Sequence, residues 1–402
     1  MKTSFEKSDK AHWSGIWALT LGVSGLMIAE FLPAGVLTPM ASDLGITEGM
    51  AGQSVTATSV FAVLSSLSIA YLTRKYNRKD VLLLLSALLI ISSGIAALTP
   101  NLPFLLFGRV LLGIALGGFW SMATAIAIRL VPTESVPKAL SIIFGGASFS
   151  AVLAAPLGSY LGNIIGWRNV FLFAAAVGVI GFIWLFISLP SLKPKGEVKL
   201  RTILDVLKIP SFTPGLFAIT LAFCGRFASI TYLRPFLEQK TGLEGNSISV
   251  VFLAFDLSYF IGTLFATGMV KKNLRLTLFL PSIVLAICSI GLFFSGKILV
   301  PTVLLIVVLG AVFAPIPVSW STWIAKTAPE NTETAGGLYV AAVQFSAGIG
   351  AMLGGAIFDV SGPAGVFSLS SITWIFSAIV VLLFIKTPKY QNRGNEQLSI
   401  HV

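Results

Sequence analysis

The sequence has little charge. Charged residues make up 11% of its 402 positions, whereas soluble domains carry about 25%. So few charges cannot cover a water-facing surface, which excludes a soluble globular protein. Cysteine and histidine are also scarce: Cys224 and Cys288 lie inside apolar runs, and His12 and His401 stand near the ends of the chain. The sequence therefore offers no disulfide framework and no histidine-based metal or catalytic site.

Long apolar runs take the place of the missing charge. Hydrophobic residues make up 55% of the sequence, and runs of about 18 to 25 residues recur, the length that crosses a bilayer as a helix. We therefore predict an all-α multi-pass membrane protein embedded in a lipid bilayer. Twelve spans are predicted near residues 13–40, 49–72, 81–99, 103–130, 138–163, 169–189, 213–236, 247–270, 276–295, 299–326, 335–358 and 364–386.

A central stretch from Ser191 to Ser211 divides the spans into six and six. It is the longest stretch between predicted spans, and it holds several basic residues and two prolines. The predicted organisation is a terminal segment, a six-helix bundle, a central loop, a second six-helix bundle and a tail, at residues 1–12, 13–189, 190–212, 213–386 and 387–402.

The basic residues indicate an orientation rather than a nucleic-acid partner. The net charge is +11, but the lysines and arginines gather in alternate short loops, among them the central loop. The other loops offer little beyond Arg168, Lys240 and Lys297. Because positive charge marks cytoplasmic loops, both ends of the chain are predicted to be cytoplasmic.

An internal repeat supports two related halves. The 33 residues from Ala139, ALSIIFGGASFSAVLAAPLGSYLGNIIGWRNVF, align without gaps to those from Ala335, AGGLYVAAVQFSAGIGAMLGGAIFDVSGPAGVF. The matched pairs include Phe149 with Phe345 and Gly158 with Gly354. Two related six-span halves are typical of secondary transporters whose site lies between them.

Several motifs carry a family resemblance. The stretch GRVLLGIALGG from Gly108 has an arginine followed by spaced glycines, and Ala155–Ser159 keeps part of a second glycine-proline pattern. In this respect the chain resembles the twelve-span drug/proton antiporter branch of the major facilitator superfamily. The loop YLTRKYNRK departs from the pattern of that branch, with Arg74 in place of an aspartate and Asn77 in place of a glycine.

Longer strings, such as AEFLPAGVLTPMASDLGITEGMAGQSVT and RLVPTESVPKALSIIFG, resemble bacterial purine ribonucleoside efflux pumps. The resemblance implies a cytoplasmic (inner) membrane protein that exports inosine- or guanosine-like nucleosides against an inward flow of protons. It implies no cofactor other than the proton as coupling ion. We expect a monomer.

Four ionisable residues fall well inside the predicted spans: Glu30, Arg109, Arg226 and Asp256. A charged side chain deep inside a membrane span is costly, so each of these residues is a candidate for a functional role. Glu30 and Arg109 are expected at similar depths, where they would form the proton-coupling site, although Arg109 is equally compatible with an architectural role. Arg226 and Asp256 are ion-pair candidates for structure or gating, with substrate contact as the alternative.

Pro33 and Pro39 follow Glu30 and would let the first span bend, with Pro39 expected to mark its end. A purine needs flat aromatic partners and a few hydrogen-bonding groups. Trp320 and Trp323 are instead expected at the membrane interface. The candidate substrate contacts are Gln53, Phe119, Trp120, Tyr232 and Gln344.

The leading interpretation is a proton-coupled purine ribonucleoside exporter. The alternatives are a drug or sugar exporter with the same coupling, a membrane-embedded enzyme and a receptor that transports nothing. An enzyme needs an acid–base or metal constellation, and no such spacing is present in the sequence. The repeat and the paired charges argue against the receptor.

Overall fold

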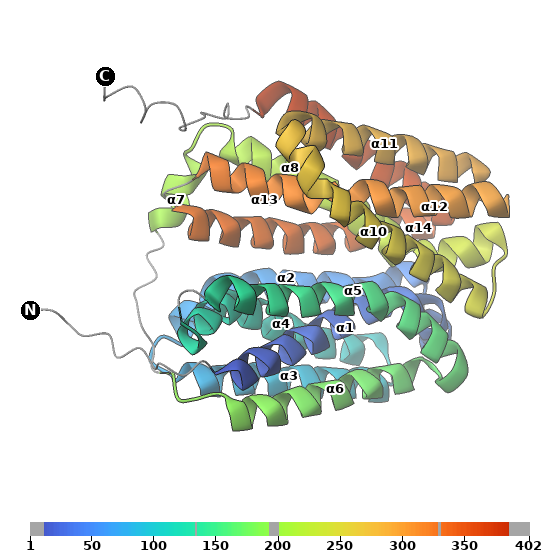
Figure 1. Ribbon diagram of the computed structural model, residues 1–402. Coiled ribbons are helices and arrows are strands. Elements are labelled where there is room, and N and C mark those ends of the chain that lie inside the picture. Colours follow the sequence, from blue (N-terminus) through green and yellow to red (C-terminus); the bar gives the residue numbers. More distant parts are fainter. Residues whose placement is uncertain (1–11, 133–134, 193–200, 329–330, 386–402) are drawn as a thin grey trace, which may run out of the picture.

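The computed structural model describes residues 12–132, 135–192, 201–328 and 331–385. This part of the chain folds into α-helices gathered in two bundles, which Figure 1 shows one above the other. The first bundle comprises α1 (Trp13–Leu44), α2 (Glu48–Leu72), α3 (Arg78–Leu98), α4 (Leu102–Leu130), α5 (Val136–Ile165) and α6 (Trp167–Ser188). The second comprises α8 (Phe212–Thr231), α9 (Leu233–Phe236), α10 (Asn246–Lys272), α11 (Leu274–Ser295), α12 (Leu299–Phe313), α13 (Pro315–Thr327) and α14 (Thr332–Phe384).

Eleven of the described helical segments are long and apolar enough to cross a membrane. The last of them, α14, contains two spans that meet at Gly362, where φ is 72° and the helix is interrupted. Glycine adopts this backbone conformation without the steric cost that a side chain adds, and Pro363 follows it. The prediction of an all-α protein with twelve spans is therefore confirmed.

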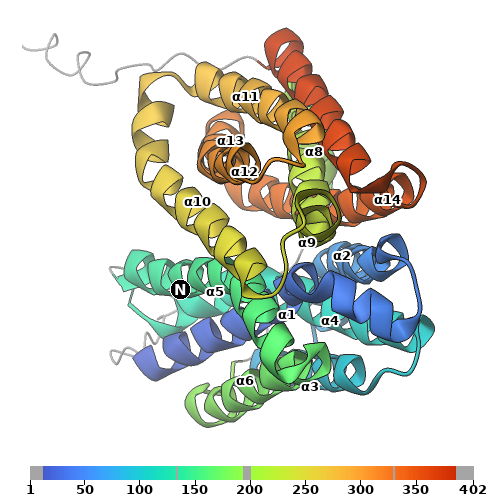
Figure 2. The same cartoon turned by 90° about the vertical axis from the view of Figure 1, so that its right-hand side faces the viewer.

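The beginning of α1 and the end of α14 lie at one end of the molecule, which we call the terminal end (left in Figure 1). The short helix α7 (Arg201–Leu207) lies at the same end. The opposite end, the far end, faces the viewer in Figure 2, with α9 at the front. There α10 packs on α5, and α9 contacts α1.

The first span is longer than predicted. We expected Pro39 to end it, but α1 continues to Leu44, with Val36 in a non-helical conformation between the two prolines. Gly45 then ends the helix with φ of 64°, and its N–H bonds to the last carbonyls. A proline removes only one hydrogen bond of a helix, that to the carbonyl four residues earlier. The helix α1 therefore bends near its prolines and continues beyond them.

Two spans of the second bundle are interrupted. The predicted seventh span breaks at Tyr232, after which α9 and a π-helical turn (Leu237–Thr241) follow. The tenth is divided into α12 and α13, which begins at Pro315. The expectation that Trp320 and Trp323 sit at the membrane interface is wrong, because both are fully buried within the second bundle.

Asn77 organises the loop after α2 in place of the expected glycine. Its Oδ1 accepts from the Lys79 N–H, which caps α3, and from the Leu192 N–H at 2.9 Å. Its Nδ2 donates to the Ser191 hydroxyl at 2.6 Å. The side chain thus ties the α2–α3 loop to the chain that leaves α6.

Candidate functional site

A polar contact joins the two bundles near the middle of α1. Gln344 of α14 donates a hydrogen bond from Nε2 to Oε1 of Glu30, over 3.1 Å, and both side chains are half-buried. A second bond between the bundles lies nearby, where the Thr56 hydroxyl of α2 donates to the Gly348 carbonyl at 3.1 Å. The sequence had assigned Glu30 and Gln344 separate roles, and the structure brings them into direct contact.

Two phenylalanine rings from opposite bundles stack on each other beside α1. Phe31 follows Glu30 on α1, and its ring is nearly parallel to that of Phe227 on α8, with an interplanar angle of 11° and centroids 6.4 Å apart. Both are half-buried. We call Glu30, Phe31, Phe227 and Gln344 the central site. The two phenylalanines are not among the predicted site residues, since 30 phenylalanines occur in the chain and nothing in the sequence distinguishes these two.

Arg109 does not pair with Glu30 in this structure. Its Nη1 donates to the carbonyl oxygen of Ala29 at 2.9 Å, and its guanidinium lies over the Phe171 ring at 4.6 Å. Proline has no N–H, so Pro33 leaves the carbonyl four residues earlier, that of Ala29, without its helical partner. The side chain is 2% exposed and lies within the first bundle. The geometry therefore favours the architectural role over direct participation in coupling.

Arg226 and Asp256 are not joined by a direct ion pair. Within the described residues the salt bridges join Arg168 to Asp43 and Arg234 to Glu238. Arg226 instead places its guanidinium over the ring of Phe255 at 4.5 Å and over that of Phe313 at 5.3 Å. Aromatic faces attract a cation when water is excluded.

The remaining substrate candidates occupy different places. Phe119 is 1% exposed and packs against Gly22, inside the core of the first bundle, so in this conformation it is a packing residue. Trp120 is half-buried and stacks on Phe144 of α5, with centroids 5.6 Å apart. Gln53 is half-buried on α2, the helix that packs on α14.

Tyr232 is fully buried where the bundles meet toward the far end. Its hydroxyl donates to the Ala351 carbonyl at 2.9 Å, and its ring stacks on Phe358. Gly52 of α2 and Gly355 of α14 make room for the hydroxyl, because a Cβ at either position would collide with it. Through these contacts Tyr232 is part of the closed interface between the two bundles and lies outside the central site.

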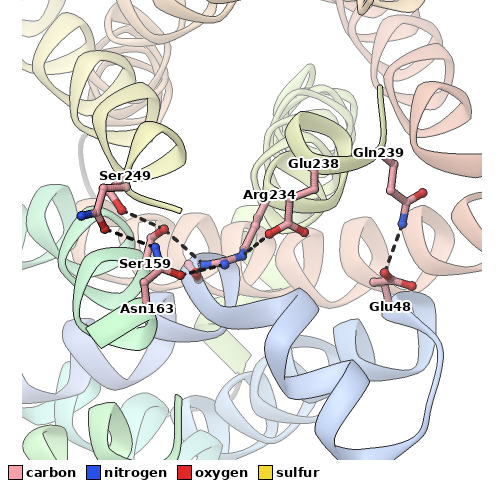
Figure 3. A network of polar contacts seen from close by, with 9 residues as sticks. Glu48, Ser159, Asn163, Arg234, Glu238, Gln239 and Ser249 are labelled. Carbon is pink, nitrogen blue, oxygen red and sulfur yellow. Dashed lines mark hydrogen bonds and ion pairs between the residues drawn. The ribbon is translucent and has the colours of Figure 1, made fainter. Parts of the chain in front are cut away.

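Arg234 is not among the predicted site residues, but it lies at the centre of a polar network at the far end (Figure 3). From α9 its guanidinium donates to the carbonyl of Gly35, the hydroxyl of Ser159 and the Oδ1 of Asn163, all in the first bundle. It also pairs with Glu238 at 2.8 Å. The signal was available, because Arg234 is a charged residue inside the run predicted as the seventh span, residues 213–236.

Other bonds between the bundles accompany this network. The Ser249 and Ser159 hydroxyls lie 3.0 Å apart, and Gln239 donates to Glu48 at 3.1 Å (Figure 3). Thr47 donates to Asp359 at 3.0 Å. The far end is therefore closed by hydrogen bonds contributed from both bundles.

Two six-span bundles that meet at a half-buried polar contact define a multi-pass membrane transporter. The chain belongs to the Major Facilitator Superfamily, whose family model matches residues 19–332 and 215–399. It is a transporter and not an enzyme.

The chain is also similar to individual proteins of known name. It is 40% identical, over 372 residues, to the "Purine ribonucleoside efflux pump NepI" of Salmonella enteritidis PT4, covering 92% of this chain and 94% of that protein. It is 39% identical, with the same coverage, to the protein of that name from Salmonella paratyphi A. The predicted resemblance to these efflux pumps is confirmed.

Solved structures share the fold at low sequence identity. A D-xylose-proton symporter superposes with a TM-score of 0.76 at 14% identity, covering 94% of this chain and 99% of that one. A bacterial homologue of the human lysosomal transporter Spinster, in an inward-facing and occupied conformation, gives 0.73 at 16% identity, covering 91% and 94%.

Proposed function

We propose that the protein is a proton-coupled antiporter that exports purine ribonucleosides, such as inosine and guanosine, from the bacterial cytoplasm. The substrate class is supported by the 40% identity to the Salmonella purine ribonucleoside efflux pumps over 92% of the chain. The coupling is supported by one observation above all, the hydrogen bond from Gln344 to the Glu30 carboxylate across the two bundles. No cofactor other than the proton is required.

The central site has the chemistry that a purine nucleoside needs. Aromatic rings stack on a flat base, and a few polar groups in an apolar setting fix its orientation. Phe31 and Phe227 provide the rings, and the Gln344 amide and the Glu30 carboxylate provide a donor and an acceptor. In this proposal the base binds beside the aromatic pair, and its polar edge replaces the contact between Gln344 and Glu30.

Coupling follows from the cost of a carboxylate charge at this depth. In the state open to the outside, a proton neutralises Glu30. In the state open to the cytoplasm, Glu30 releases that proton, and a cytoplasmic nucleoside then binds. The far end, closed in the conformation described here, is the outer side when the terminal end faces the cytoplasm.

The protein is proposed to lie in the cytoplasmic (inner) membrane with both ends of the chain in the cytoplasm. The exposed Lys75 and Lys208 at the terminal end, against fewer basic residues at the far end, support this orientation. One chain supplies both bundles and every residue of the central site, so we propose that it works as a monomer.

Counterflow of radiolabelled inosine into proteoliposomes loaded with unlabelled inosine tests the substrate class. We expect transient accumulation of the label, which guanosine in excess abolishes. Absence of counterflow with every nucleoside, together with exchange of a drug or a sugar, would favour the alternative exporter. A protein that exchanges none of these solutes would contradict both.

A further inference from the structure

The two prolines of α1 leave two backbone carbonyls without helical partners. Because proline lacks an N–H, Pro33 frees the carbonyl of Ala29 and Pro39 frees that of Gly35. The structure supplies an arginine to each: Arg109 donates to Ala29, and Arg234 donates to Gly35. A buried carbonyl needs a donor, so both arginines answer a requirement that the prolines create.

The two arginines differ in the bundle from which they come. Arg109 lies on α4, in the same bundle as α1, so its bond persists whichever way the bundles tilt. Arg234 lies on α9 of the second bundle, so its bond to Gly35 exists only while the far end is closed. A hydrogen bond from an arginine to a carbonyl freed by proline is therefore found once within a bundle and once between the bundles.

The position of Gly35 makes its carbonyl a fixed target. A Cβ on Gly35 would collide with the Ala155 carbonyl of α5, so the backbones of α1 and α5 approach closely at this point. Ser159, one turn further along α5, accepts from the same guanidinium nitrogen at 3.2 Å. The planar fork of arginine, with its five fixed donors, suits several acceptors held in a rigid arrangement.

Arg234 keeps a partner when the far end opens. Glu238 stands four residues later in the same bundle, with its Oε1 2.8 Å from Nε of Arg234. Separation of the bundles therefore leaves the guanidinium paired with its carboxylate and exposes the Gly35 carbonyl to water. Neither state contains an isolated buried charge, which is the condition for a contact that breaks in each cycle.

We propose that Pro39, Gly35 and Arg234 form a breakable lock on the far end. Pro39 keeps the Gly35 carbonyl free of helical bonding, and Arg234 docks on this carbonyl when the far end closes. Arg234 is thus a positioning residue that sets the balance between closed and open conformations. The lock does not depend on the identity of the substrate or of the coupling ion.

Spin labels on the two bundles at the far end measure this balance directly. Ser42 of α1 and Lys297 between α11 and α12 are exposed, and cysteines at these positions can be labelled once Cys224 and Cys288, both buried, are replaced by alanine. Electron–electron double resonance without any substrate then gives the closed and open populations. We expect Arg234→Gln to raise the open-to-closed ratio about tenfold or more, as for loss of a hydrogen bond to a charged group.

The prolines provide a matched pair of variants. Pro39→Ala restores an N–H that competes for the Gly35 carbonyl, so it should also raise the open population, and adding Arg234→Gln should give less than the combined effect. Pro33→Ala restores the bond to Ala29 within one bundle and should leave the ratio unchanged. The proposal is overturned if Arg234→Gln leaves the ratio unchanged, if the two shifts are additive, or if Pro33→Ala acts like Pro39→Ala.

If Arg234→Gln does not fold, a second variant tests the same proposal. Arg234→Lys keeps the charge beside Glu238 but loses the fork, and it should shift the ratio in the same direction by a smaller factor. Equal distance distributions for Arg234→Lys, Pro39→Ala and the unmodified protein would contradict the lock, independently of any result on nucleoside transport.

Discussion

Arg109 donates a hydrogen bond over 2.9 Å to the carbonyl oxygen of Ala29, the acceptor that Pro33 leaves open on the next turn of α1. Arg109→Met keeps most of the apolar volume and removes the donor. We expect a loss of about 1.5–3 kcal/mol in the free energy of unfolding, the usual worth of a hydrogen bond to a charged group. Thermal unfolding in detergent measures the change.

Pro33→Ala supplies the matched rescue. The new N–H bonds to the Ala29 carbonyl, so Arg109→Met combined with Pro33→Ala should be more stable than Arg109→Met alone. A double variant that is less stable than the unmodified protein by the full sum of the two single losses would show that Arg109 and Pro33 act independently.

Glu30→Gln tests the coupling. The variant mimics the neutral carboxyl at nearly the same volume, so it should insert and fold normally. We expect it to lose accumulation of inosine driven by an imposed pH gradient while retaining counterflow, which needs no net proton movement. The paired measurement in proteoliposomes separates loss of coupling from loss of binding.

Glu48→Gln is the matched control for Glu30→Gln. Glu48 lies at the far end, where it accepts from Gln239 at 3.1 Å, and it has no part in the central site. We expect accumulation driven by the pH gradient to persist in this variant. If Glu30→Gln accumulates inosine as well as Glu48→Gln does, Glu30 is not the coupling residue, and Asp256 becomes the next candidate.

Asn77→Ala should destabilise the first bundle. Loss of the helix cap alone costs about 1 kcal/mol, and Asn77 also bonds to Leu192 and Ser191. Asn101→Ala is the matched comparison, because Asn101 caps α4 through the Phe104 N–H without such a link to a distant segment. A larger drop in the unfolding temperature is expected for Asn77→Ala, and equal drops would show that the ties to Leu192 and Ser191 contribute nothing.

Thiol labelling of intact cells tests the orientation. Single cysteines at Lys75 and Lys208, both exposed at the terminal end, should resist an impermeant reagent, whereas a cysteine at the exposed Lys297 should react. Permeabilised cells provide the control, in which all three positions should react. Labelling of Lys75→Cys or Lys208→Cys without permeabilisation would reverse the assignment.

The sequence was sufficient for the spans because each one depends on composition over a long window, and a bilayer accepts little else. The end of α1 was predicted wrongly from the sequence. Pro39 is tolerated inside the helix because an arginine from a distant helix bonds to the carbonyl that it frees. No local pattern announces that partner, which lies 199 residues away in the chain.

The candidate site was predicted in parts. Glu30 and Gln344 were found because charge and amides are rare in lipid, but their contact depends on the packing of α14 against the first bundle. Depth along a helix was expected to pair Glu30 with Arg109 and Arg226 with Asp256. Depth does not fix the direction in which a side chain points around the helix, and both arginines lie over aromatic rings.

Glycines hold each bundle together from within. Gly113 and Gly117 of α4 meet the backbone of α2, and Gly262 and Gly310 join α10 to α12 in the same way, so that a Cβ at any of them would collide with a carbonyl oxygen. Such close backbone contact packs the helices of each bundle tightly against one another. Opening of the far end then replaces side-chain hydrogen bonds between the bundles with hydrogen bonds to water. This exchange keeps the end states of the transport cycle close in free energy. A solute that binds one state more tightly by a few kcal/mol is then enough to shift the population from one end state to the other.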